Sequence, residues 1–87
     1  MLNKVKLSLR ISGDMFDIEI QDLIKAALTD LKISGVVNTE ETDPLILRAV
    51  ITYCKANFGY DNNEAERFQK SYDMLKQHLS LAGDYNA

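Results

Sequence analysis

The sequence contains few of the residues that usually carry chemistry. Among 87 residues it has one cysteine, one histidine and no tryptophan. The lone Cys54 cannot form an internal disulfide, which indicates a reducing compartment. Its place among apolar residues favours a buried, inert thiol over a nucleophile. His78 has no second histidine or cysteine close in sequence, so metal-ligand spacing is absent and a solvated or half-buried side chain is expected.

Long apolar runs and an excess of positive charge are also absent. Without a run of roughly eighteen apolar residues, no membrane-spanning helix is expected. Lys4, Lys6 and Arg10 interrupt the N-terminal stretch where a secretory signal would need an apolar core, and we therefore expect a cytoplasmic protein. Ten basic residues against thirteen acidic ones give a net charge of −3, which argues against a dedicated phosphate-binding face.

Motifs for catalysis and cofactor binding are missing as well. There is no phosphate loop, no glycine-rich dinucleotide turn and no Gly-x-Ser-x-Gly elbow. Asp61, Glu64 and Glu66 form an acidic cluster, but it does not match the ligand pattern of a calcium loop. Helix capping and interaction with the helix dipole explain these acids. We predict no catalytic residue, no metal site, no cofactor and hence no enzyme.

The residues that are present predict one all-α domain over 1–87, a small bundle of three main helices plus a short N-terminal helix. Apolar residues at steps of three and four predict the clearest helix over 14–34. Asp14 is the predicted N-cap of that helix, and Gly35 suits the left-handed position that ends it. Its apolar face comprises Phe16, Ile20, Leu23, Ile24, Ala27, Leu28 and Leu31.

The next helix is predicted over 43–57. Asp43 is its predicted cap, and Pro44 takes the first helical position, where the missing N–H costs nothing. Gly59 is predicted to end it. One face carries Ile46, Ala49, Val50, Tyr53, Cys54 and Asn57.

The same helix has apolar residues beyond this stripe. Leu45, Leu47 and Ile51 widen the apolar surface, as in a helix that is central or contacts another chain. We predict that these residues contribute to subunit contacts. Phe58 and Tyr60 lie beside a turn, and we expect them to contact protein rather than stack on bases, because no positive groove accompanies them.

The last main helix is predicted to begin near Asn63, with Glu66 at the capping-box distance; a start at Asp61 with Glu64 fits equally well. A seam of apolar residues is expected to pack on the other helices. The tail 83–87 is expected to fray in a lone subunit. The seam comprises Ala65, Phe68, Tyr72, Leu75 and Leu79.

The first dozen residues fit two structures. Val5, Leu7, Leu9 and Ile11 alternate with polar residues, which favours a strand. No second strand is evident to pair with it, and an unpaired strand leaves its backbone groups unsatisfied. Leu2 fits one helical face together with Val5 and Leu9.

Taken in order, several of these features resemble the small head–tail connector, or adaptor, proteins of tailed double-stranded DNA phages and prophages. The resemblance covers about residues 5–81 and implies a short N-terminal helix. The chain departs from many members after the aromatic turn, where an acidic stretch replaces an arginine-rich motif. The matching features are Val5-Lys6, Leu9-Arg10-Ile11, Asp17, Ile24, Ala26-Ala27, Asp43-Pro44-Leu45, Ala49, Tyr53 and the Asn57-to-Asp61 turn.

The resemblance also implies a function. Family members form a homo-oligomeric ring beneath the portal, join the DNA-filled head to the tail, and are often called DNA-packaging proteins. The implied partners are further copies, the portal protein and tail-side connector proteins, with no membrane. DNA would pass through without sequence-specific binding. The implied location is the virion at the head–tail junction, and before assembly the cytoplasm of the bacterial host.

Two other functions are alternatives for a small helical chain. One is a small monomeric acidic protein-binding module, carrier-protein-like or regulatory, but the Asp-Ser-Leu triplet of acyl carrier proteins is absent. The other is a helix-turn-helix DNA binder. The connection over 35–42 has about eight residues and is too long for that motif. The helix after it offers only Arg48 and Lys55, too few positive groups to read a groove.

Overall fold

The computed structural model describes residues 1–59 and 62–86. These residues contain helices and no strand, which confirms the all-α prediction, and residues 2–9 adopt the helical alternative. In order along the chain the helices are α1 (Leu2–Leu9), α2 (Asp17–Ile33), α3 (Pro44–Asn57), α4 (Ala65–Leu81) and the short α5 (Gly83–Asn86).

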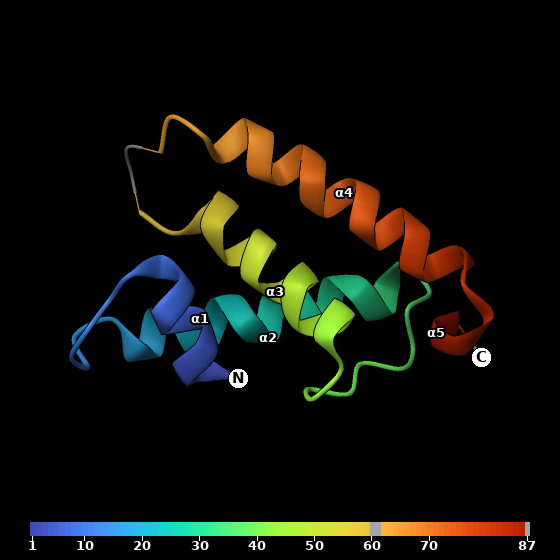
Figure 1. Cartoon of the computed structure of the whole chain (residues 1–87), viewed down its shortest axis with the longest axis horizontal. Coiled ribbons are helices and arrows are strands. Elements are labelled where there is room, and N and C mark those ends of the chain that lie inside the picture. The colour runs from blue at the N-terminus through green and yellow to red at the C-terminus, as the bar shows by residue number, and fades with distance from the viewer. Residues whose placement is uncertain (60–61, 87) are drawn as a thin grey trace.

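Helix α3 lies at the centre of the bundle and packs against α1, α2 and α4 (Figure 1). Helix α4 runs antiparallel beside it, and α2 crosses on the other side. Every one of these four helices contributes to one core, because each has an apolar face that must be removed from water. The buried side chains are Val5, Ile20, Ile24, Ala27, Leu31, Val36, Ile46, Ala49, Val50, Cys54, Tyr72 and Leu79.

The start of α2 corrects the predicted cap at Asp14. The helix begins at Asp17, with Phe16 in the cap position and no side-chain cap. Residues 14–16 form a turn in which the Asp17 N–H donates to the Asp14 carbonyl at 3.2 Å. Lys6 of α1 holds the first turn from outside, with its Nζ 2.7 Å from Asp17 Oδ1 and donating to the Gly13 carbonyl. Lys6 thus links α1 to the turn before α2 and to the first residue of α2.

The end of α2 and the start of α3 agree with the predicted roles of Gly35 and Asp43. Gly35 has φ of +99° just after α2, and the Val36 N–H donates to the Leu31 carbonyl at 2.9 Å. Asp43 Oδ1 accepts hydrogen bonds from the Leu45 N–H at 2.8 Å and the Ile46 N–H at 3.4 Å. Both features need only residues close in sequence.

The start of α4 corrects the predicted cap at Asn63. The helix begins at Ala65 with Glu64 in the cap position, and no side chain caps it. Asn62 organises the turn instead, because its Oδ1 accepts from the Glu64 N–H at 3.1 Å while its Nδ2 donates to the Lys55 carbonyl. The turn is thus tied to the end of α3. The alternative start at Asp61 lies outside the described residues.

The expectation of a frayed tail is wrong for residues 83–86. These residues form α5, which lies against the connection between α2 and α3 (Figure 1). The Tyr85 carbonyl accepts from the N–H groups of Val37 at 2.8 Å and Asn38 at 3.1 Å. The Tyr85 hydroxyl donates to Asp43 Oδ2 at 2.8 Å. A carboxylate that caps α3 therefore also anchors the C-terminal end of the chain.

Candidate interaction surface

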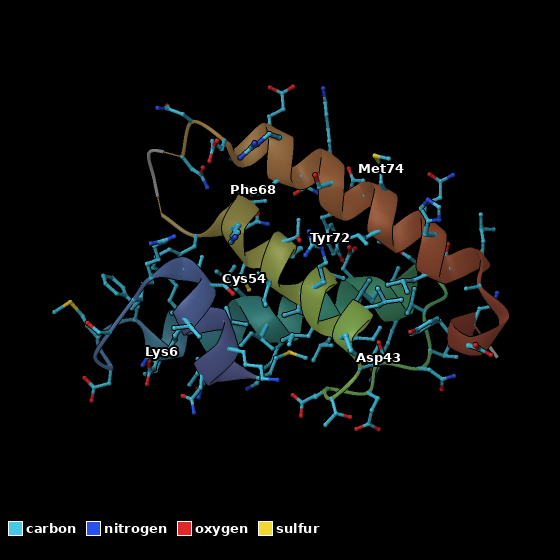
Figure 2. All side chains as sticks on the ribbon, viewed as in Figure 1. Lys6, Asp43, Cys54, Phe68, Tyr72 and Met74 are labelled. Atoms are coloured by element: carbon cyan, nitrogen blue, oxygen red, sulfur yellow. The ribbon has the colours of Figure 1, made fainter. Side chains whose placement is uncertain are left out.

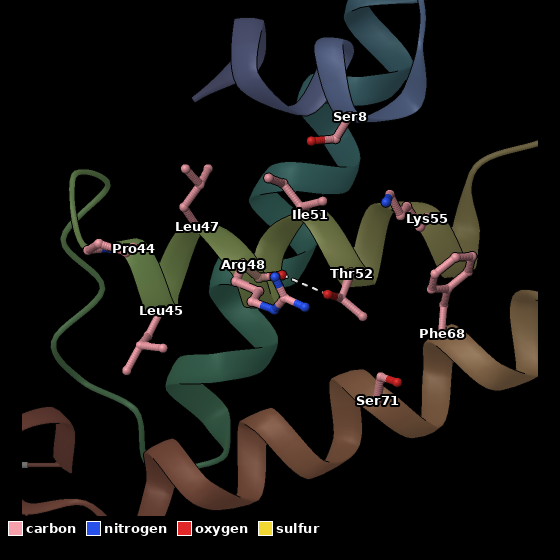
Figure 3. Close-up of a pocket in the computed structure, with 10 residues that line it drawn as sticks. All are labelled: Ser8, Pro44, Leu45, Leu47, Arg48, Ile51, Thr52, Lys55, Phe68 and Ser71. Atoms are coloured by element: carbon pink, nitrogen blue, oxygen red, sulfur yellow. Dashed lines mark hydrogen bonds between the residues drawn. The ribbon is translucent and has the colours of Figure 1, made fainter.

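A groove of about 500 Å³ follows the outward side of α3, between α1 and α4 (Figure 3). We call it the α3 groove. Helix α3 supplies most of its wall, and α1 and α4 close its two sides. The lining residues are Ser8, Pro44, Leu45, Leu47, Arg48, Ile51, Thr52, Lys55, Phe68 and Ser71.

The three apolar residues singled out from the sequence all line this groove. Leu45 is 46% exposed, whereas Leu47 and Ile51 are partly buried. Leu47 and Ile51 are four residues apart and therefore neighbours on one helix face. Ile51 also packs against the buried core, and in Figure 3 Leu47 and Ile51 point toward α1 whereas Leu45 points toward α4. The wide apolar surface of this helix is thus divided between the core and the groove.

The groove also carries positive charge. Arg48 and Lys55 line it, and α3 contains no acidic residue. Thr52 lies between them and donates to the Arg48 carbonyl at 2.8 Å. The Lys55 Nζ lies 5.5 Å from the centre of the Phe68 ring, a cation–π contact. In the described part of the chain, no carboxylate comes within 4.0 Å of either cation.

Sequence reasoning considered these cations only as DNA contacts and missed the groove. The signal was present, because positions 48, 52 and 55 follow helical spacing and form a polar stripe beside Leu47 and Ile51. What the sequence could not reveal is that Ser8 and Phe68, from two other helices, would close the sides of this stripe. The arrangement suits a partner with apolar side chains and nearby acids.

Phe58, another predicted contact residue, does not line the groove. Phe58 is partly buried, and its ring meets the Phe16 ring edge-on, with centroids 5.5 Å apart. This pair connects the end of α3 to the turn before α2 and stabilises the fold. Tyr60 lies outside the described residues.

A polar network sets the position of α4 relative to α2. The buried Tyr72 donates its hydroxyl to Asp30 Oδ2 at 2.6 Å, and Lys76 Nζ lies 3.0 Å from the same oxygen. Burial raises the pKa of Asp30, but the hydrogen bonds from Tyr72 and Lys76 and the charge of Lys76 outweigh it and lower the pKa. Burial and the Asp30 hydrogen bond raise the pKa of Tyr72. The Tyr53 ring packs edge-on against Tyr72 at 5.1 Å.

The two residues considered for chemistry, Cys54 and His78, lie on α3 and α4. Cys54 is buried between the helices, and burial raises its pKa to about 12, so the thiolate is disfavoured (Figure 2). His78 is exposed on α4. Across residues 1–59 and 62–86, no three His, Cys, Asp or Glu side chains group as metal ligands would. In those same ranges, no helix has the length and apolarity to cross a membrane.

Comparison with known proteins gives one finding. A family model described as phage connector protein matches residues 1–86. No curated protein and no solved structure gives a match to the chain.

Proposed function

Since the chain belongs to the phage connector protein family, we propose that it is a subunit of a ring that joins the portal of the DNA-filled head to the tail. Family membership confirms the resemblance seen in the sequence and makes the protein a structural component of the virion. The match over residues 1–86 carries this conclusion. The proposal includes the ring, its contact with the portal and the channel through which the DNA passes.

The surface of the chain supports association with other proteins. For a chain of 87 residues, it exposes many large apolar side chains, on every main helix. Covering such side chains with another protein removes apolar surface from water, which favours association. Identical subunits that associate head to tail close into a ring when their rotation permits. The exposed residues are Leu7, Met15, Phe16, Ile18, Ile33, Val37, Leu45, Met74 and Leu81.

The charge of the chain supports DNA passage without retention. Strong DNA binding requires many lysine and arginine contacts to phosphates. The chain has a net charge of −3, which disfavours tight binding to the negatively charged DNA backbone. A subunit of this kind would surround the channel while the DNA moves through it. We propose the portal protein on one side and tail-side connector proteins on the other as its partners.

Light scattering and electron microscopy of the full chain, alone and mixed with purified portal rings, test this function. We expect rings, either from the chain alone or on the portal. A chain that stays monomeric in both conditions contradicts the proposal and favours the monomeric binding module. A mobility-shift assay with double-stranded DNA at moderate salt is expected to show no sequence-specific complex.

One substitution tests whether the α3 groove takes part in assembly. Leu47→Asp places a charge on the partly buried groove wall, so we expect it to weaken ring assembly more than it lowers the thermal stability of the monomer. Ile33→Asp is a matched control, because Ile33 is 80% exposed and does not line the groove. If Leu47→Asp reduces folding and assembly to the same extent, the groove is a structural feature only.

A further inference from the structure

The start of α2 has a surface opposite in charge to the α3 groove. Residues 14–22 contain Asp14, Asp17, Glu19 and Asp22 and no lysine or arginine. Asp17 is paired with Lys6, whereas the other three acids are exposed. We call residues 14–22 the acidic end of α2.

Two apolar side chains project from this acidic surface. Met15 is 84% exposed and Ile18 is 77% exposed, which places them among the most exposed large apolar residues of the chain. Both flank the exposed carboxylates in sequence. The acidic end thus presents what the α3 groove is suited to accept, namely apolar side chains with acids beside them.

The acidic end and the groove are separate surfaces of the same chain. None of residues 14–22 lines the groove. Figure 1 places the start of α2 at one end of the molecule, beside α1, while the groove extends along α3 toward Pro44. Both surfaces can therefore be occupied at the same time, each by a different neighbour.

We propose that the acidic end of α2 in one copy docks into the α3 groove of the next copy. This inference rests on the proposed ring and specifies which two faces meet in it. Met15 and Ile18 would bury their side chains against Leu47 and Ile51, which gives the hydrophobic contribution. The contact joins two different faces and is therefore heterologous, the kind of contact that generates rings.

Opposite charges would accompany the apolar contact. Glu19 and Asp22 lie near the start of α2, and Arg48 and Lys55 line the α3 groove. Carboxylates at the rim of the groove would find cations that have no acidic partner among the described residues. Complementary charges of this kind speed association and exclude wrong alignments. A second copy is favoured over DNA as the occupant, because two cations beside an apolar wall offer too few phosphate contacts.

Charge reversal tests the pairing. One variant carries Arg48→Glu with Lys55→Glu, and a second carries Glu19→Lys with Asp22→Lys. Each variant then faces like charges when it meets itself, and we expect its self-association to weaken at least about tenfold. In an equimolar mixture each interface again joins opposite charges, so alternating assembly is expected to return. A chain with all four substitutions retains the wild-type net charge of −3 and is also expected to assemble.

All chains are measured by light scattering, alone and with portal rings, and circular dichroism checks that each one folds. If the reversed variants assemble like the wild type, or if both fail and neither the mixture nor the fourfold variant recovers, the inference is overturned while the ring stands. In that case the groove takes another occupant, such as a portal or tail segment. If the wild type itself never assembles in either condition, the proposed function fails.

A second measurement does not depend on charge. Chains with Ile18→Cys and chains with Ile51→Cys are mixed and treated with a short bis-maleimide. The native Cys54 is buried and should not react, so it does not interfere. We expect cross-linked dimers of one chain type with the other in clearly more than the roughly twofold excess over each self-dimer that random pairing of an equimolar mixture gives. A ratio no higher than that of random pairing would overturn the assignment of these two faces.

Discussion

Replacing Tyr72 with phenylalanine isolates one hydrogen bond that spans two helices. The hydroxyl of Tyr72 donates to Asp30 Oδ2 at 2.6 Å, linking α4 to α2. Phenylalanine retains the ring, so the buried volume and the edge-on contact with Tyr53 are preserved. The change therefore reports on the hydroxyl rather than on packing.

The magnitude follows from the acceptor and its exposure. A hydrogen bond to a charged acceptor contributes about 1.5–3 kcal/mol. The Asp30 side chain is 36% exposed and keeps Lys76 as a partner, so water and the lysine replace part of the lost contact. We expect Tyr72→Phe to lower the free energy of unfolding by about 1–2 kcal/mol. In a domain of this size the melting temperature should fall by about 5–15 °C.

The pH dependence provides an independent check. The pKa of Asp30 is lowered in the folded state from its ordinary value of 3.8. Its contribution to stability is therefore present above that value and is lost as the pH falls through the folded pKa. Because the Tyr72 hydroxyl favours the charged carboxylate, the difference between wild type and Tyr72→Phe should shrink in acid.

The assay is urea unfolding followed by circular dichroism at neutral and at acidic pH. Tyr53→Phe serves as control, since that hydroxyl makes no hydrogen bond with the residues that the structure describes. Its effect should stay within about 0.5 kcal/mol. If Tyr72→Phe and the wild type are equally stable at neutral pH, or if the loss does not change in acid, the hydroxyl does not stabilise the fold through the Asp30 carboxylate.

Two further predictions concern the C-terminal end and the thiol. Tyr85→Phe removes the hydroxyl that bonds to Asp43 and lowers its pKa. The Tyr85 carbonyl accepts hydrogen bonds from the Val37 and Asn38 N–H groups, so exchange of these two amides should accelerate at neutral pH when Tyr85 is held less firmly. Hydrogen-exchange mass spectrometry measures this. In the wild type, the protection of these amides relative to their intrinsic exchange rate at each pH should also fall as the pH falls through the pKa of Asp43, and a wild type that keeps its protection contradicts the anchor. Cys54 should react with a thiol reagent only as the chain unfolds, because its pKa is raised to about 12; labelling that is fast in native buffer and unaffected by urea contradicts its burial.

Local sequence was sufficient for features that depend on nearby residues. Asp43 and Pro44 predicted the start of α3, because a cap needs only N–H groups two and three residues ahead. Gly35 predicted the end of α2 for a similar reason, since its positive φ is easy only for glycine. Periodic apolar residues predicted the core, and Ile20, Ala27 and other members of that face are buried.

Local sequence failed where a distant element decided the outcome. Helix α2 starts at 17 rather than 14, where Lys6 of α1 contacts Asp17, and α4 starts at 65, after a turn in which Asn62 is bonded to the end of α3. The tail was expected to fray, since nothing near it in sequence predicts that Tyr85 would reach Asp43.

For the candidate site, the spacing of residues along α3 was enough to predict that the helix has more apolar surface than one core face can take, because Leu45, Leu47 and Ile51 lie outside its main stripe. Family membership then assigned a connector role that no motif for catalysis competes with. That this surplus forms a groove with Arg48 and Lys55 beside it follows from the packing of the helices. A groove requires side chains from helices far apart in the chain, and their approach depends on how the whole core packs.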